Sequence, residues 1–189
     1  MKRFITFKFI VLALLFGCNP DSNITSPDDS MTQPLLKLIQ LPAPKGLSIE
    51  TLYTESKYIN GYHGGYFTEQ FGYQSSTGYV NIISKLVFPE NAFSGGKTIT
   101  QTFNTETASL EFGPVMEFNR TVKYTLTITG LDLTGIDPET LDFAYIASDG
   151  SVTGVVYDDI YMNPASGTLK VTNARLNHFS RYGFVRRGY

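Results

Sequence analysis

From about residue 49 onward, apolar residues recur at every second position or in short runs, and Gly, Asn, Asp and Pro separate these stretches. One face of residues 122–130 is apolar throughout and comprises Val122, Tyr124, Leu126 and Ile128. A period of two is the spacing of a half-buried β-strand. The chain is therefore predicted to form strands at 79–89, 97–103, 108–113, 122–130, 141–148, 167–174 and 181–186.

No window carries an amphipathic helical stripe of normal length, and the turn sequences "SGG", "SDG" and "NPASG" fall between the predicted strands. Short strands separated by such turns are typical of an antiparallel β-sandwich or barrel. The predicted fold class is all-β, as a single antiparallel domain over residues 46–189.

The first 17 residues have the features of a secretory signal peptide. Lys2, Arg3 and Lys8 supply positive charge, and residues 9–16 are apolar but too few for a stable membrane span. Residues 15–18, "LFGC", resemble the bacterial lipobox, whose cysteine becomes the lipidated first residue after cleavage. We expect acyl chains on Cys18 to anchor the protein in a membrane. The alternative is an ordinary secreted protein with one free cysteine.

Residues 18–45 are predicted to form a tether between the lipid anchor and the β-domain. Residues 19–34 are rich in Ser, Pro, Asp and Asn, and such a composition cannot bury enough apolar surface to fold. The stretch "LLKLIQLPAPKG" that follows has more apolar residues, but Pro42 and Pro44 limit any helix. It is consistent with either a short strand or a docking segment.

Composition narrows the functional classes. Cleavage before Cys18 leaves 12 basic against 17 acidic residues, a formal charge of −5, and no basic patch suggests a nucleic acid partner. With a single Cys, the chain forms no internal disulfide, and with no Trp its large side chains are 12 Tyr and 14 Phe. The 172 residues left after cleavage suffice for one core.

Four segments occur in an order that resembles the ZU5 domain, over roughly residues 58–186. They are "LVFPENAFSGGKTITQTF", "ASLEFGPVMEFNRTVKYTLTI", "LDFAYIASDGSV" and "LNHFSRYGF". ZU5 is a β-sandwich module of ankyrins, netrin receptors, death-domain adaptors and bacterial exported proteins. The resemblance implies a sandwich in which a strand ends at Pro89, Gly113-Pro114 separates two strands, and Asp149-Gly150 forms a hairpin turn.

His178-Phe179-Ser180 is the sharpest catalytic candidate. Some ZU5 proteins cut themselves between the Phe and Ser of this motif. Here Ser180 Oγ would attack the Phe179 carbonyl, an N→O acyl shift would follow, and His178 would act as general base. The alternative, which we favour, is that the motif belongs to the closing strand, with Phe179 in the core and no catalytic role.

The segment "YINGYHGGYFTEQFGYQ" (58–74) is rich in aromatic residues and glycine. Tyr62, Tyr66 and Tyr73 are candidates for a platform that binds sugar rings or a partner protein. The alternative, which we favour here too, is a hairpin whose aromatic residues pair across its two strands.

No metal site is expected. The candidate carboxylates have no calcium-loop spacing and are interpreted as surface turns; they are Asp132, Asp137, Asp142, Asp149, Asp158 and Asp159. His63 and His178 are the only histidines and cannot complete a zinc site with Cys18, which is assigned to the anchor.

The expected function is that of a non-enzymatic binding module without cofactor, anchored in the bacterial cell envelope through Cys18. Asn19 after that cysteine favours the outer membrane. The expected partners are the membrane and an envelope protein or carbohydrate. Self-cleavage between Phe179 and Ser180 is the alternative. A hydrolase of envelope polymers ranks last, because the sequence offers no paired carboxylates, nucleophile elbow or metal ligands.

Overall fold

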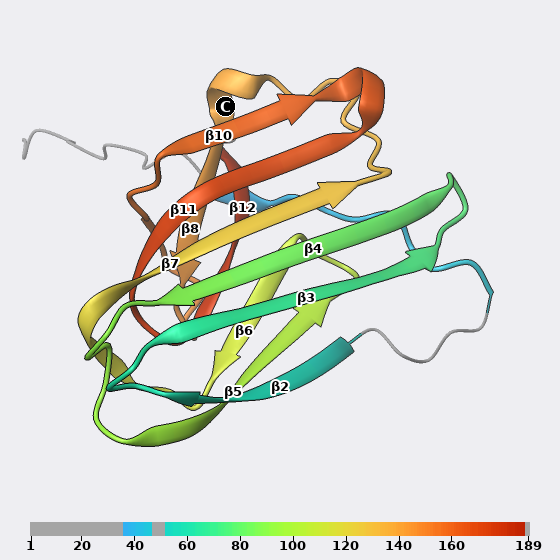
Figure 1. The fold of residues 1–189 in the computed structure, drawn as a ribbon. Helices are drawn as coiled ribbons and strands as arrows, with labels where there is room; N and C mark the ends of the chain where they lie inside the picture. The colour runs from blue at the N-terminus through green and yellow to red at the C-terminus, as the bar shows by residue number, and fades with distance from the viewer. Residues whose placement is uncertain (1–35, 47–51, 188–189) are drawn as a thin grey trace, which may run out of the picture. The chain divides into compact units, whose positions relative to one another are not determined.

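Two antiparallel sheets pack face to face in a computed structural model that describes residues 36–46 and 52–187 (Figure 1). The expected signal peptide, Cys18 and tether residues 19–34 lie outside the described residues. Within the described residues, no helix is both long and apolar enough to span a membrane. The two helical segments there are single 3-10 turns, Pro138–Thr140 and Pro164–Ser166.

The larger sheet has seven strands, with β1 paired to β12 beside the main path. In spatial order the main path is β2 (Leu52–Asn60), β5 (Gly96–Asn104), β6 (Ser109–Gly113), β12 (Arg181–Arg187), β8 (Leu141–Ile146) and β9 (Val152–Gly154); β1 is Leu36–Leu38.

The smaller sheet has five strands and lies in front in Figure 1. Its order is β10 (Asp159–Asn163), β11 (Thr168–His178), β7 (Glu117–Thr129), β4 (Tyr79–Phe88) and β3 (Gly65–Gln74). The sequence prediction of an all-β antiparallel sandwich is confirmed.

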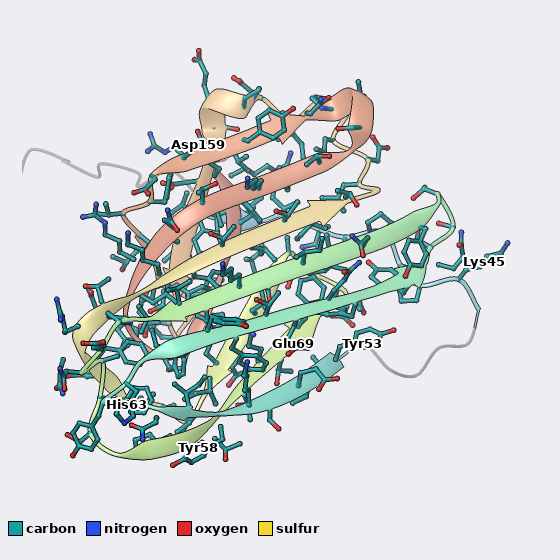
Figure 2. All side chains as sticks on the ribbon, viewed as in Figure 1. Lys45, Tyr53, Tyr58, His63, Glu69 and Asp159 are labelled. Atoms are coloured by element: carbon teal, nitrogen blue, oxygen red, sulfur yellow. The ribbon has the colours of Figure 1, made fainter. Side chains whose placement is uncertain are left out.

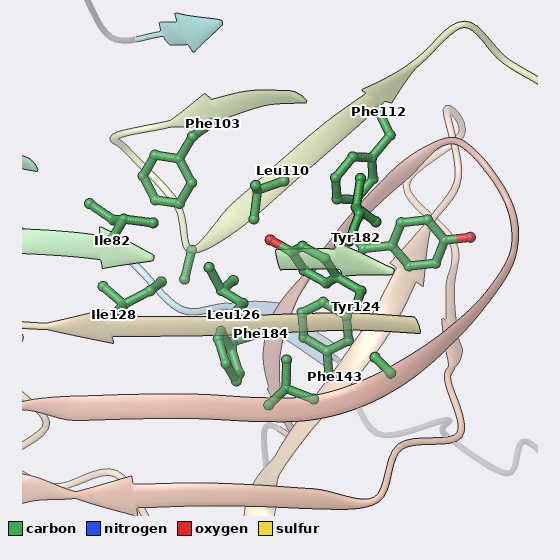
Figure 3. Packing of buried hydrophobic residues seen from close by; sticks show 14 of the residues in the cluster. Ile82, Phe103, Leu110, Phe112, Tyr124, Leu126, Ile128, Phe143, Tyr182 and Phe184 are labelled. Carbon is green, nitrogen blue, oxygen red and sulfur yellow. The ribbon is translucent and has the colours of Figure 1, made fainter. Parts of the chain in front are cut away.

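The core fills the space between the sheets (Figure 3). The alternating face of β7 is entirely buried, as its period of two predicted. Phe103, Phe112 and Phe143 pack against it from the opposite sheet. Phe112 and Tyr124 bring the two sheets into ring contact, with centroids 5.1 Å apart. The numerous Phe and Tyr residues therefore supply the large core side chains in a chain without tryptophan.

All seven predicted strands are present, and the predicted breaks occur where the residues dictate them. β4 ends one residue before Pro89, which has no N–H to donate to a ladder. β6 ends at Gly113, before Pro114. Gly150, with φ of 83°, lies in the turn between the paired strands β8 and β9.

Residues 58–74 form no paired hairpin, which corrects the favoured interpretation of this segment. β2 pairs with β5 and β3 pairs with β4, in different sheets. Only an isolated bridge joins Asn60 to Gly64. Gly64 and Gly65 have φ values of 68° and 146°, which turn the chain out of one sheet and into the other.

Part of the predicted tether packs on the sandwich. β1 pairs with β12, and Ile39 and Leu41 are buried in the core. The stretch "LLKLIQLPAPKG" was predicted to be either a short strand or a docking segment, and the structure shows both in it. The boundary between tether and β-domain was expected between residues 45 and 46, but residues before it, from 36 to 41, already pack on the sandwich.

Candidate functional site

The His178-Phe179-Ser180 motif links the two sheets. His178 is the last residue of β11 in the five-stranded sheet, and β12 of the seven-stranded sheet begins at Arg181. Phe179 and Ser180 therefore lie between strands, which corrects the prediction that the motif is part of the closing strand. Two backbone hydrogen bonds fix the link: Phe179 N donates to Met116 O at 2.8 Å, and Phe112 N donates to Ser180 O at 2.9 Å.

Phe179 is fully buried, as predicted. Its ring stacks on Phe112 with centroids 5.3 Å apart and meets the edge of Phe118 at 4.8 Å. Phe88 completes the cluster at 6.1 Å. These partners come from both sheets, so the ring joins the sandwich halves at the crossing point.

His178 is held by two tyrosines. The Tyr182 hydroxyl donates to the His178 carbonyl oxygen at 2.8 Å and lies 3.4 Å from His178 Nδ1. The Tyr145 ring packs edge-on against the imidazole, with centroids 4.8 Å apart. Burial, with a smaller contribution from Tyr145, raises the pKa of Tyr182 above its usual value, so the hydroxyl remains a donor.

His178 and Ser180 line different cavities. Ser180 borders a cavity of about 460 Å³ together with Leu38, Glu111 and Arg181. His178 borders a second cavity, of about 430 Å³, with Tyr145 and Tyr182 among its other lining residues. Self-cleavage would require the His178 imidazole to take the Ser180 hydroxyl proton. The two residues line separate cavities, and the recorded side-chain partner of the His178 imidazole is Tyr182, not Ser180.

The three tyrosines proposed as a binding platform do not share one exposed surface. Tyr62 and Tyr66 are 56% and 61% exposed, whereas Tyr73 is 7% exposed. The Tyr73 hydroxyl donates to Pro42 O at 2.9 Å, and burial raises its pKa to about 12. Tyr73 therefore fastens the segment before residue 46 to the sandwich, and only Tyr62 and Tyr66 present surface rings.

Tyr66 lies close to two lysines. Lys57 Nζ is 4.7 Å from the ring centroid and Lys85 Nζ is 6.0 Å from it, both within cation–π range. Lys57 comes from β2 and Tyr66 from β3, edge strands of the two sheets. Figure 2 labels Tyr53 on β2 and Glu69 on β3. Burial, followed by the charge of Glu55, raises the pKa of Glu69 at this edge.

The outer face of the five-stranded sheet exposes several large apolar or aromatic side chains. They are Tyr66 on β3, Tyr79, Ile83 and Val87 on β4, and Tyr161 on β10. Figure 2 labels Asp159 on β10, at the opposite edge of this sheet from β3. Tyr66 and Val87 are direct partners on neighbouring strands, whereas Tyr79 lies at the other end of β4 and Tyr161 on the opposite edge strand.

The acidic residues singled out in the sequence mostly stabilise local structure. Asp132 and Asp149 accept hydrogen bonds from Thr134 and Ser151, which lowers the pKa of both carboxyls. Asp137, Asp142 and Asp158 each accept a hydrogen bond as well, and Asp159 begins β10 instead of lying in a turn. Within the described residues, no three His, Cys, Asp or Glu side chains are placed to hold a metal ion.

Sequence reasoning missed two features of these surfaces. The first is the hydrogen bond from Tyr182 to His178. The only sequence signal for it was that the two residues are four positions apart, on either side of the link between the two sheets. The second is Arg175 beside Lys123, which are direct partners on β11 and β7. No local signal marks this pair, since 52 residues separate the two in the chain.

Comparison with protein-family models, with curated protein sequences and with solved structures finds no match to this chain.

Proposed function

We propose that this chain is a lipid-anchored, non-enzymatic binding module of the bacterial cell envelope, with a ZU5-like sandwich. The observation that carries the proposal is the outer face of the five-stranded sheet, on which the large side chains of Tyr66, Tyr79, Ile83, Val87 and Tyr161 are all exposed. A flat face of this kind can contact a partner without any movement of the core.

The ZU5 likeness is supported by the places where strands end. The break before Pro89, the break at Gly113-Pro114 and the hairpin at Asp149-Gly150 agree with the order of segments that carries the resemblance. The lipid anchor rests on the lipobox-like residues before Cys18.

Self-cleavage between Phe179 and Ser180 is the second candidate. One observation favours it: the Tyr182 hydroxyl lies 3.4 Å from His178 Nδ1, where it could orient the imidazole. The burial of Phe179 and the separate cavities that His178 and Ser180 line favour the structural role instead. We therefore rank the binding function first.

A site-specific photocrosslinker tests the proposed face in living cells. Ile83 lies within the face, and Val115, which is 87% exposed in the loop after β6, serves as the matched exposed apolar control. We expect a discrete crosslinked product from position 83 and none from position 115. Equal products from both positions, or none from position 83, would contradict the proposal.

A further inference from the structure

The outer face of the five-stranded sheet also carries a concentration of positive charge. Lys85, Lys123, Lys170 and Arg175 project from its central strands, whereas its outward carboxylates, Glu117 and Asp159, lie at a strand end and on the edge strand. The whole chain has a formal charge of −2. The charge of this face is therefore opposite in sign to that of the chain.

Two of these side chains, Arg175 and Lys123, belong to one line of paired residues across the sheet. Arg175 on β11 is paired with Lys123 on β7, Lys123 with Val87 on β4, and Val87 with Tyr66 on β3. Lys85 lies two residues from Val87 on the same face and close to the Tyr66 ring. We call Arg175, Lys123, Lys85 and Tyr66 the basic row.

The basic row breaks a rule of sheet stability. Like charges directly opposite each other on neighbouring strands are destabilising, and Arg175 and Lys123 are such a pair. Both are exposed, and within the described residues neither forms an ion pair with a carboxylate. Asp158, which is bonded to β11, accepts a hydrogen bond from Asn173 instead. Positions that break a local rule without compensation are where functional sites are expected. An anionic ligand lying along the row would remove the repulsion.

The spacing of the row distinguishes between classes of anionic polymer. Neighbouring strands lie about 4.8 Å apart, so the four strands of the row span about 14 Å. This step is close to the length of one sugar residue in an extended polysaccharide. An extended peptide advances only about 3.3 Å per residue and sends alternate side chains to opposite sides. On the line itself only Arg175 and Lys123 are cations, because the β4 position is Val87. A ligand that pairs with both needs acid groups about 4.8 Å apart, closer than the same-side residues of an extended peptide, which are about 6.6 Å apart.

Two further features fit a sugar chain. The exposed Tyr66 ring ends the row, and Lys57 Nζ lies 4.7 Å from its centroid, so a sugar would stack on the ring surface that this lysine leaves free. At the β11 end of the row, Arg175 also lines the cavity of about 430 Å³ that His178 and Asn177 border. That cavity offers room for a terminal or branching sugar.

We propose that the basic row binds an anionic polysaccharide, with Arg175, Lys123 and Lys85 pairing with its acid groups and Tyr66 stacking on a sugar ring. This inference rests on the proposed binding function and names its ligand class.

Affinity electrophoresis in gels that contain sodium alginate tests the inference on the full-length chain in nonionic detergent, with neutral dextran gels as reference. The test variant is Lys123→Gln with Arg175→Gln. The control variant, Lys37→Gln with Lys97→Gln, removes the same charge from the seven-stranded sheet. Circular dichroism confirms that each variant is folded.

We expect alginate, but not dextran, to retard the wild-type chain. Each lost surface ion pair should weaken binding by up to about fivefold, so the test variant should bind up to about 25-fold more weakly while the control variant changes less than about twofold. Tyr66→Ala should also weaken binding, although it leaves the charge unchanged.

Three results would overturn the inference: no retardation of the wild type by alginate, equal loss in the two charge variants, or tighter binding to poly-L-glutamate than to alginate. If any of them occurs while the crosslink from position 83 persists, the polysaccharide assignment is wrong and the binding function stands. Loss of that crosslink would refute the binding function itself.

Discussion

Replacing Phe179 with alanine removes a ring that contacts Phe88, Phe112 and Phe118 at the crossing between the two sheets. The side chain is fully buried, and truncation of a buried Phe costs about 3–5 kcal/mol. Favourable ring contacts add to that cost, so we expect about 4–5 kcal/mol here. This is a large part of the 5–15 kcal/mol by which a domain is normally stable.

The loss can be measured by urea unfolding, followed by tyrosine fluorescence and far-UV circular dichroism. The melting temperature should fall by about 8–20 °C, because about 1 kcal/mol corresponds to 2–4 °C in a chain of this length. Phe179→Leu retains most of the apolar volume and should cost less than half as much. Ser180→Ala removes at most about one net hydrogen bond, worth about 1 kcal/mol.

Two results would refute this reasoning. The first is a loss below about 2 kcal/mol for Phe179→Ala, which would mean that the ring does not join the sheets. The second is a loss for Ser180→Ala equal to that for Phe179→Ala, which would place the energetic weight of the motif on its hydroxyl.

Three further predictions concern other parts of the chain. Cys18→Ala should leave an unprocessed precursor without acyl chains, and unchanged processing with partition into detergent would contradict the anchor. Tyr73→Phe should lower the free energy of unfolding by about 1 kcal/mol through loss of the hydrogen bond to Pro42, whereas Tyr66→Phe should not change it; equal losses in urea titrations would contradict the different burial of the two rings. The raised pKa of Tyr73, about 12, means that the folded state keeps a proton that the unfolded chain releases near pH 10. Stability should therefore be constant below about pH 10 and fall as the pH rises toward 12, and a urea midpoint that does not fall between pH 9 and pH 11.5 would contradict this linkage.

Alternation along single strands was sufficient to predict most of the sheet elements. The buried face of β7 is a direct consequence of its period of two, and the strand ends at Pro89 and Gly113 follow from backbone chemistry. These properties are local. They depend on a residue and its neighbours in the chain.

The pairing of strands was not predictable in the same way. β2 and β3 are consecutive and rich in aromatic residues, which suggested a hairpin, but they belong to different sheets. β9, with three residues, is too short to give a periodic signal. Both outcomes depend on contacts between segments that are distant in the chain.

The residues that share an exposed surface were not predictable either, for the same reason. Lys123 and Arg175 occupy ordinary polar positions in two alternating strands, and only the register between β7 and β11 brings them together. Tyr73 resembled Tyr62 and Tyr66 in sequence, yet it points into the sandwich, because the spacing from Tyr66 to Tyr73 is odd. That parity could have been read from the sequence once the strand was assigned.

The most direct test of the central claim is the intact mass of the protein, purified from membranes and measured under denaturing conditions. A lipid-anchored module without self-cleavage predicts one species that contains residues 18–189 plus the mass of acyl chains on Cys18. A fragment of residues 180–189 that disappears in Ser180→Ala would show self-cleavage, and an unmodified Cys18 would exclude the lipid anchor. Either result would contradict the proposed function.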